Sequence, residues 1–157
     1  MKKLLLIIIV FAFTQGVYAQ SEKQINDINQ SVLIIKNGLP KNSPADKTWT
    51  GDTVQSVIRD NDKVSYVCWK RIENYTIIKH EYFFSNEKLI FYEESRTDLD
   101  QNVVKDQKYY IADTHLLSWI SDETAVAKTS KEFSDMDLKL SMINNDWTNC
   151  KPFKKTN

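Results

Sequence analysis

The feature that most constrains the fold is a strand–turn–strand unit that recurs along the middle of the chain. Residues 81–92 (EYFFSNEKLIFY) align with residues 108–119 (KYYIADTHLLSW) at an offset of 27, and a fainter copy covers residues 57–67. Each unit joins two runs of aromatic and β-branched residues through a cluster that contains Asn or Asp, which is typical of a hairpin. Asn and Asp tolerate positive φ, so they can form tight turns without glycine. The three units predict a meander of about six antiparallel strands over residues 49–120.

The segments on either side of the repeats have helical spacing. Residues 21–37 are expected to form a helix with one apolar face, which ends where Gly38 and Pro40 interrupt the pattern. Residues 40–48 then form a loop. A second helical segment is expected over residues 130–148, with Ser130 or Thr129 as its N-cap. The apolar positions of the two segments are Ile25, Ile28, Val32 and Ile35 in the first, and Phe133, Met136, Leu140, Ile143 and Trp147 in the second.

Both faces of the predicted sheet are apolar. In the second strand of each hairpin, Leu89 and Phe91 alternate with Ile90 and Tyr92, although alternate side chains point to opposite faces. A sheet with one solvated face would show a polar face. Either the two helices cover the sheet or one of its faces is a binding surface, and both cases give a single α+β domain over residues 20–157.

The first 19 residues have the pattern of a secretory signal peptide. Lys2 and Lys3 precede an apolar run of ten residues, and Val17 and Ala19 occupy the −3 and −1 positions of a cleavage site. The run is shorter than the roughly 20 residues that a membrane-spanning helix needs. We expect cleavage after Ala19 and a soluble mature protein in the periplasm or outside the cell, with no membrane contact after processing.

Composition excludes several classes of function. The chain has 157 residues with 21 basic and 21 acidic side chains, and the loss of Lys2 and Lys3 would leave a net charge of −2. A nucleic-acid-binding protein usually carries a basic excess, so no nucleic acid is expected as partner. The sequence has no phosphate-binding, dinucleotide-binding or nucleophile-elbow motif. We therefore expect neither enzymatic activity nor a cofactor.

The histidines and paired carboxylates give no chemical signature. His80 and His115 lie in no metal-binding motif, so no metal is expected, and both are interpreted as partly exposed residues at strand ends. Paired carboxylates occur at Glu93 and Glu94 and at Asp98 and Asp100. Glycoside hydrolysis needs two such groups across a cleft, but residues 93–100 are interpreted as a solvated connection between strands.

Two further sets of residues are candidates for specific roles. Cys68 and Cys150 are the two cysteines, and an even number in an exported chain predicts a disulfide between them. Trp69, Tyr92 and Trp119 recur near the end of each unit and are the candidate binding strip, because exposed aromatic rings make rigid contact surfaces. Core packing is the alternative role for these three side chains.

The chain loosely resembles a group of small, uncharacterised, exported bacterial proteins. These have an N-terminal helix and a meander of tyrosine-rich units, Y-Y/F-F/I-x-N-G-K-L, which here correspond to residues 82–89 and 109–116. Glu87 and Thr114 replace the turn glycine of those units. The resemblance implies the same helix and meander over residues 21–120, and it implies no activity.

These observations favour an exported, non-enzymatic protein that binds a protein, a peptide or an envelope ligand through the sheet face or an edge strand. Two alternatives remain open. The chain could inhibit an envelope hydrolase, or it could be an envelope hydrolase of an unrecognised type. A concave pocket that holds two or more converging ionisable groups with shifted pKa values would favour the hydrolase.

Overall fold

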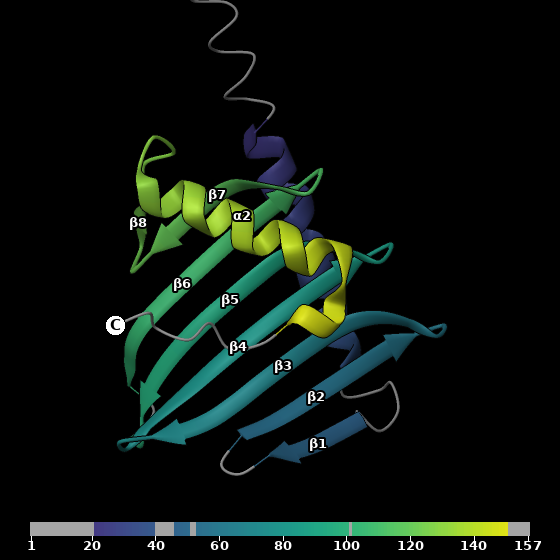
Figure 1. Cartoon of the computed structure of the whole chain (residues 1–157), viewed down its shortest axis with the longest axis vertical. Coiled ribbons are helices and arrows are strands. Elements are labelled where there is room, and N and C mark those ends of the chain that lie inside the picture. The colour runs from purple at the N-terminus through teal and green to yellow at the C-terminus, as the bar shows by residue number, and fades with distance from the viewer. Residues whose placement is uncertain (1–20, 40–45, 51–52, 101, 151–157) are drawn as a thin grey trace, which may run out of the picture.

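The computed structural model describes residues 21–39, 46–50, 53–100 and 102–150 (Figure 1). An N-terminal helix covers residues 21–38. The other elements, in chain order, are β1 (Asp46–Thr50), β2 (Thr53–Asp60), β3 (Lys63–Glu73), β4 (Thr76–Ser85), β5 (Lys88–Asp98), β6 (Val103–Ala112), β7 (His115–Ser121), β8 (Thr124–Ala125), α2 (Lys131–Asn145) and a 3-10 turn (Trp147–Asn149).

The strands form one antiparallel sheet in the order β1 to β8. The predicted α+β fold is therefore confirmed, and the six expected strands correspond to β2–β7. Strand β1 begins at Asp46, inside the expected loop over residues 40–48, and β8 adds two residues at the other edge. The expected signal peptide lies outside the described residues.

Five two-residue turns connect strands of the meander, and both residues of each have positive φ. This is the geometry of a type I′ turn, whose twist matches that of the flanking strands. The first residue of each turn is Asn or Asp, because these side chains tolerate the left-handed conformation. The sequence predicted the three turns that lie within the repeat units. The turns are Asn61–Asp62, Asn74–Tyr75, Asn86–Glu87, Asp113–Thr114 and Asp122–Glu123.

Helices cover both faces of the sheet. Figure 1 shows α2 crossing one face, while the N-terminal helix lies behind the other. On the α2 face, the rings of Tyr82, Tyr92 and Tyr109 stack at centroid distances of 4.6 and 4.8 Å and are completely buried. On the opposite face, Phe83 and Phe91 pack with Ile28 and Val32 of the N-terminal helix and form a second core. The two helices thus explain why both faces of the strands are apolar.

Two polar side chains of α2 bind the sheet at equivalent positions of its hairpins. Asn144 Oδ1 accepts a hydrogen bond of 2.9 Å from the N–H of Leu89, and Asp137 Oδ1 accepts one of 2.6 Å from the N–H of Leu116. Leu89 and Leu116 are the second residues of β5 and β7, which lie about 10 Å apart at the usual strand spacing. Asn144 and Asp137 are two helical turns apart, which is also about 10 Å. The spacing on α2 therefore matches the spacing of alternate strands.

The helical segment near the C-terminus has the predicted N-cap but an earlier end. Ser130 accepts a hydrogen bond from the N–H of Phe133, and α2 ends at Asn145. Asp146 is extended, with φ −153°, and its carboxylate accepts a hydrogen bond from the N–H of Thr148 in the 3-10 turn. The break occurs because Asp favours such local capping over a continued helix.

The predicted disulfide between Cys68 and Cys150 is wrong, because both cysteines are free. Strand alternation gives the reason. Cys68 packs with the core of the N-terminal helix, whereas Cys150 is completely buried in the core of α2. The neighbouring Trp69 points to the α2 face, where its Nε1 donates a hydrogen bond to the carbonyl of Cys150. The sheet therefore separates the two thiols.

Candidate functional site

The candidate binding strip lies on the α2 face but is mainly core, and its members occupy two rows. Tyr92 and Trp119 share one row, whereas Trp69 is paired in register with His80 in the next. Tyr92 is 0% exposed, so its ring offers no surface to a ligand. Trp69 and Trp119 are partly buried against the same core, and the Trp119 ring lies 5.1 Å from that of Tyr109. The three rings therefore do not form the continuous strip that the sequence suggested, and a ligand would reach only the two tryptophans.

The row that begins at Trp69 continues across the strands through buried polar side chains. His80 is paired in register with Glu94, and Glu94 with Gln107. All three side chains are buried, and His80 is 3% exposed. The interpretation of His80 as a partly exposed residue at a strand end is therefore wrong. His115 is exposed beside a turn, with its Nδ1 3.3 Å from a carboxylate oxygen of Asp137.

The hydroxyl of Tyr92 joins His80 and Glu94. It lies 2.8 Å from Nδ1 of His80 and 3.4 Å from Oε2 of Glu94. Arg96 donates two hydrogen bonds to Oε1 of Glu94, at 2.9 and 3.1 Å. Burial lowers the pKa of His80 to about 4; Glu94 opposes the shift, whereas Arg71 and Arg96 add to it. A neutral imidazole in a satisfied network is what a structural role requires.

The paired carboxylates do not form an acid–base pair. Strand β5 continues to Asp98, so the interpretation of residues 93–100 as a solvated connection is wrong for most of this segment. Glu94 belongs to the network on the α2 face, while Glu93 forms an ion pair of 2.9 Å with Lys36 of the N-terminal helix. Asp98 accepts hydrogen bonds from Asn102 within the β5–β6 connection. Glu93, Glu94 and Asp98 thus each have a structural partner.

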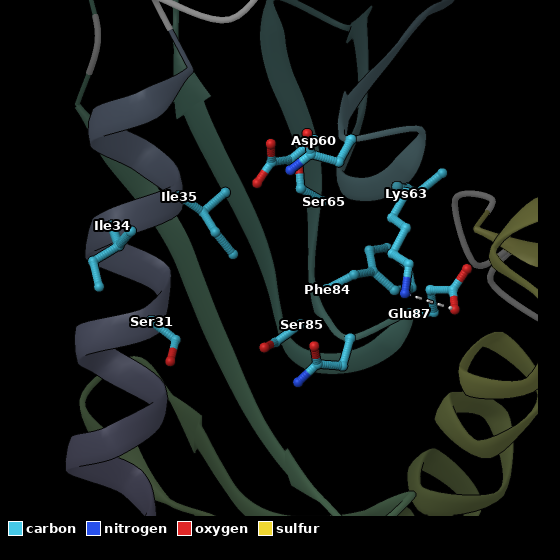
Figure 2. A pocket seen from close by; sticks show the side chains of 12 residues that line it. Ser31, Ile34, Ile35, Asp60, Lys63, Ser65, Phe84, Ser85 and Glu87 are labelled. Atoms are coloured by element: carbon cyan, nitrogen blue, oxygen red, sulfur yellow. Dashed lines mark ion pairs between the residues drawn. The ribbon is translucent and has the colours of Figure 1, made fainter.

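A concave surface lies between the N-terminal helix and the hairpin turns. One cavity of about 490 Å³ is lined by helix residues that include Ser31 and Ile35, and by the β2–β3 and β4–β5 turns (Figure 2). Figure 2 shows the helix and the turns on opposite sides of the opening, with Ser31 and Ile35 pointing across it. A second cavity, of about 380 Å³, continues past the β4–β5 turn to the β6–β7 turn and shares Ser85 and Asn86 with the first.

We call these two adjoining cavities the turn groove. One continuous face of the N-terminal helix forms its wall, at the spacing expected for neighbours on a helix. That face consists of Gln24, Asp27, Ile28, Ser31, Ile34 and Ile35. It extends over eleven residue steps, or about 16 Å. This length corresponds to about five residues of an extended peptide.

The sequence analysis did not identify the turn groove. The sequence signal for the groove is the unbroken apolar run from Val32 to Ile35. Of this run, only Val32 and Ile35 are needed for the helix face that packs on the sheet. Ile34 lies off that face, lines the turn groove and is 71% exposed. An exposed isoleucine on a wall of a cavity is a surface that a ligand could cover.

The described residues contain no group of three or more His, Cys, Asp or Glu side chains arranged to hold a metal ion. Within the same ranges, no helix has the length and the apolar character needed to cross a lipid bilayer. Comparisons of the chain with protein-family models, with curated proteins and with solved structures found no match.

Proposed function

We propose that this chain is an exported, non-enzymatic protein that binds an extended peptide segment of a partner in the turn groove. The observation that carries the proposal is the groove itself. It is elongated, open to solvent, and lined by an exposed apolar side chain on one wall and by polar turn residues on the other. Binding sites typically combine an apolar wall with a few polar groups in this way.

The turn groove replaces the sheet face as the proposed binding surface. The central ring of the candidate strip is buried, whereas Ile34 is exposed. The buried network of His80, Tyr92 and Glu94 supports a non-enzymatic role. Its polar groups already bond one another, and neither cavity of the turn groove is lined by them.

Export rests on the signal pattern of residues 1–19. We expect the processed protein to begin at Gln20. N-terminal sequencing of the protein recovered from the periplasm and from the culture medium tests this expectation and distinguishes the two compartments. An unprocessed chain in the membrane fraction would contradict it.

A library of random peptides tests binding in the turn groove. Peptides selected on the mature protein should lose at least tenfold in affinity for Ser31→Trp, because an indole would fill the larger cavity. Asn26→Trp is the matched control, since Asn26 is exposed on the same helix and lines neither cavity. Equal affinity for both variants would show that the peptides bind elsewhere and would contradict the proposal.

A further inference from the structure

We propose that the turn groove selects a cationic peptide, in which Lys or Arg side chains alternate with apolar ones. This inference rests on the proposed function and names the chemistry of the ligand. It follows from the charges along the groove and from the exposed apolar side chain on its helix wall.

Carboxylates outnumber cations along the turn groove. Four acidic side chains line it, and two lysines oppose them. The acidic residues are Asp27, Asp60, Glu87 and Asp113, and the lysines are Lys63 and Lys88. The groove therefore has a net charge of −2, while the precursor as a whole has equal numbers of acidic and basic residues.

One lysine is already paired within the groove. Lys63 Nζ lies 3.5 Å from Oε2 of Glu87, and Figure 2 shows this pair on the turn side of the opening. Among the residues that the structure describes, no ion pair involves Asp27, Asp60 or Asp113. These three carboxylates are thus available to the cationic groups of a ligand.

The three carboxylates are distributed along the groove. Asp60 lies at the β2–β3 turn in the larger cavity, whereas Asp27 of the helix and Asp113 of the β6–β7 turn line the other. Ile34 provides exposed apolar surface on the helix wall of the larger cavity. In an extended peptide, alternate side chains point the same way about 7 Å apart. A peptide with alternating basic and apolar residues therefore fits both the charges and the isoleucine, whereas a small inorganic cation would leave the apolar wall uncovered.

The inference is tested with three labelled pentapeptides that share two leucines: Lys-Leu-Lys-Leu-Lys, Ser-Leu-Ser-Leu-Ser and Glu-Leu-Glu-Leu-Glu. Fluorescence polarisation with the mature protein at low ionic strength should rank their affinities as lysine above serine above glutamate. Removal of one exposed carboxylate should weaken the lysine peptide roughly two- to fivefold. The triple variant Asp27→Asn, Asp60→Asn and Asp113→Asn should abolish the preference, and salt should weaken it in the unmodified protein.

Asp135→Asn is the matched control. Asp135 lies on α2, away from the groove, in a surface ion pair with Lys131, so this variant should keep the full preference. If the lysine and serine peptides bind with equal affinity, and Ser31→Trp weakens both, the charge selection is overturned but the proposal of a peptide groove stands. Tighter binding of the glutamate peptide, or no binding of any of the three at millimolar concentration, would also overturn the cationic ligand. The library selection tests the groove separately.

Discussion

The buried histidine makes the stability of this protein depend on pH over a defined range. His80 has a pKa of about 4 in the folded protein, against 6.5 for an exposed histidine. Burial is the main cause. Glu94 favours a positive charge on the ring and offsets part of this shift, whereas Arg71 and Arg96 add to it.

The direction of the pH dependence follows from whether the folded or the unfolded state binds the proton. Above pH 6.5, His80 is neutral in both states and contributes no pH dependence. Between pH 6.5 and about 4, the unfolded chain binds a proton that the folded protein does not, so the free energy of unfolding decreases as the pH falls. Each pH unit in this interval is worth about 1.4 kcal/mol, so the total loss from His80 is about 3 kcal/mol at pH 4.

Urea denaturation followed by tryptophan fluorescence, repeated from pH 7.5 to pH 4, measures this loss. His80→Gln should lower stability at neutral pH, because the 2.8 Å contact with the Tyr92 hydroxyl is lost or weakened. The same variant should also flatten the pH profile by about 3 kcal/mol relative to the unmodified protein. Carboxylates that titrate in the same range contribute to both profiles, so they cancel in the difference.

His115→Asn is the control, because His115 is exposed and its replacement should leave the profile nearly unchanged. Parallel profiles for the unmodified protein and His80→Gln would refute the reasoning. They would show that His80 binds its proton equally well in the folded and unfolded states, and hence that it is not buried as neutral imidazole.

Three further predictions concern the fold. Asn144→Ala should lower the free energy of unfolding by about 1–3 kcal/mol in urea titrations, because the buried N–H of Leu89 loses its acceptor; an unchanged midpoint would show that another group or water replaces the amide. Tyr75→Asn should raise the melting temperature, since Tyr75 has φ 60° and an 81% exposed side chain, and a bulky residue in this conformation costs about 1 kcal/mol; a decrease would reveal a stabilising contact of the ring. Finally, a thiol reagent should label both Cys68 and Cys150 in the denatured mature protein without reductant, and a mass deficit of two hydrogens would contradict the free thiols.

The sequence alone determined the local structure of the meander. Positive φ at adjacent turn residues is costly for most side chains, so Asn61, Asn86 and Asp113 marked the turns although no glycine was present. Period-two alternation fixed which side chains share a face. Likewise, Ser130 marked the start of α2 because a serine hydroxyl can accept a hydrogen bond from an N–H of the first helical turn.

Only the tertiary structure decided what each face contacts. The sequence showed that Cys68 and Trp69 point to opposite faces, but not that the segment ending at Cys150 covers the Trp69 face. The burial of His80 and the turn groove likewise depend on how the helices lie against the sheet, and neither depends on the residues next to them in the chain. Alternation and turn chemistry are local, whereas burial, pKa and concavity arise from segments distant in sequence. For this reason the fold class could be predicted from the sequence, and the candidate site could not.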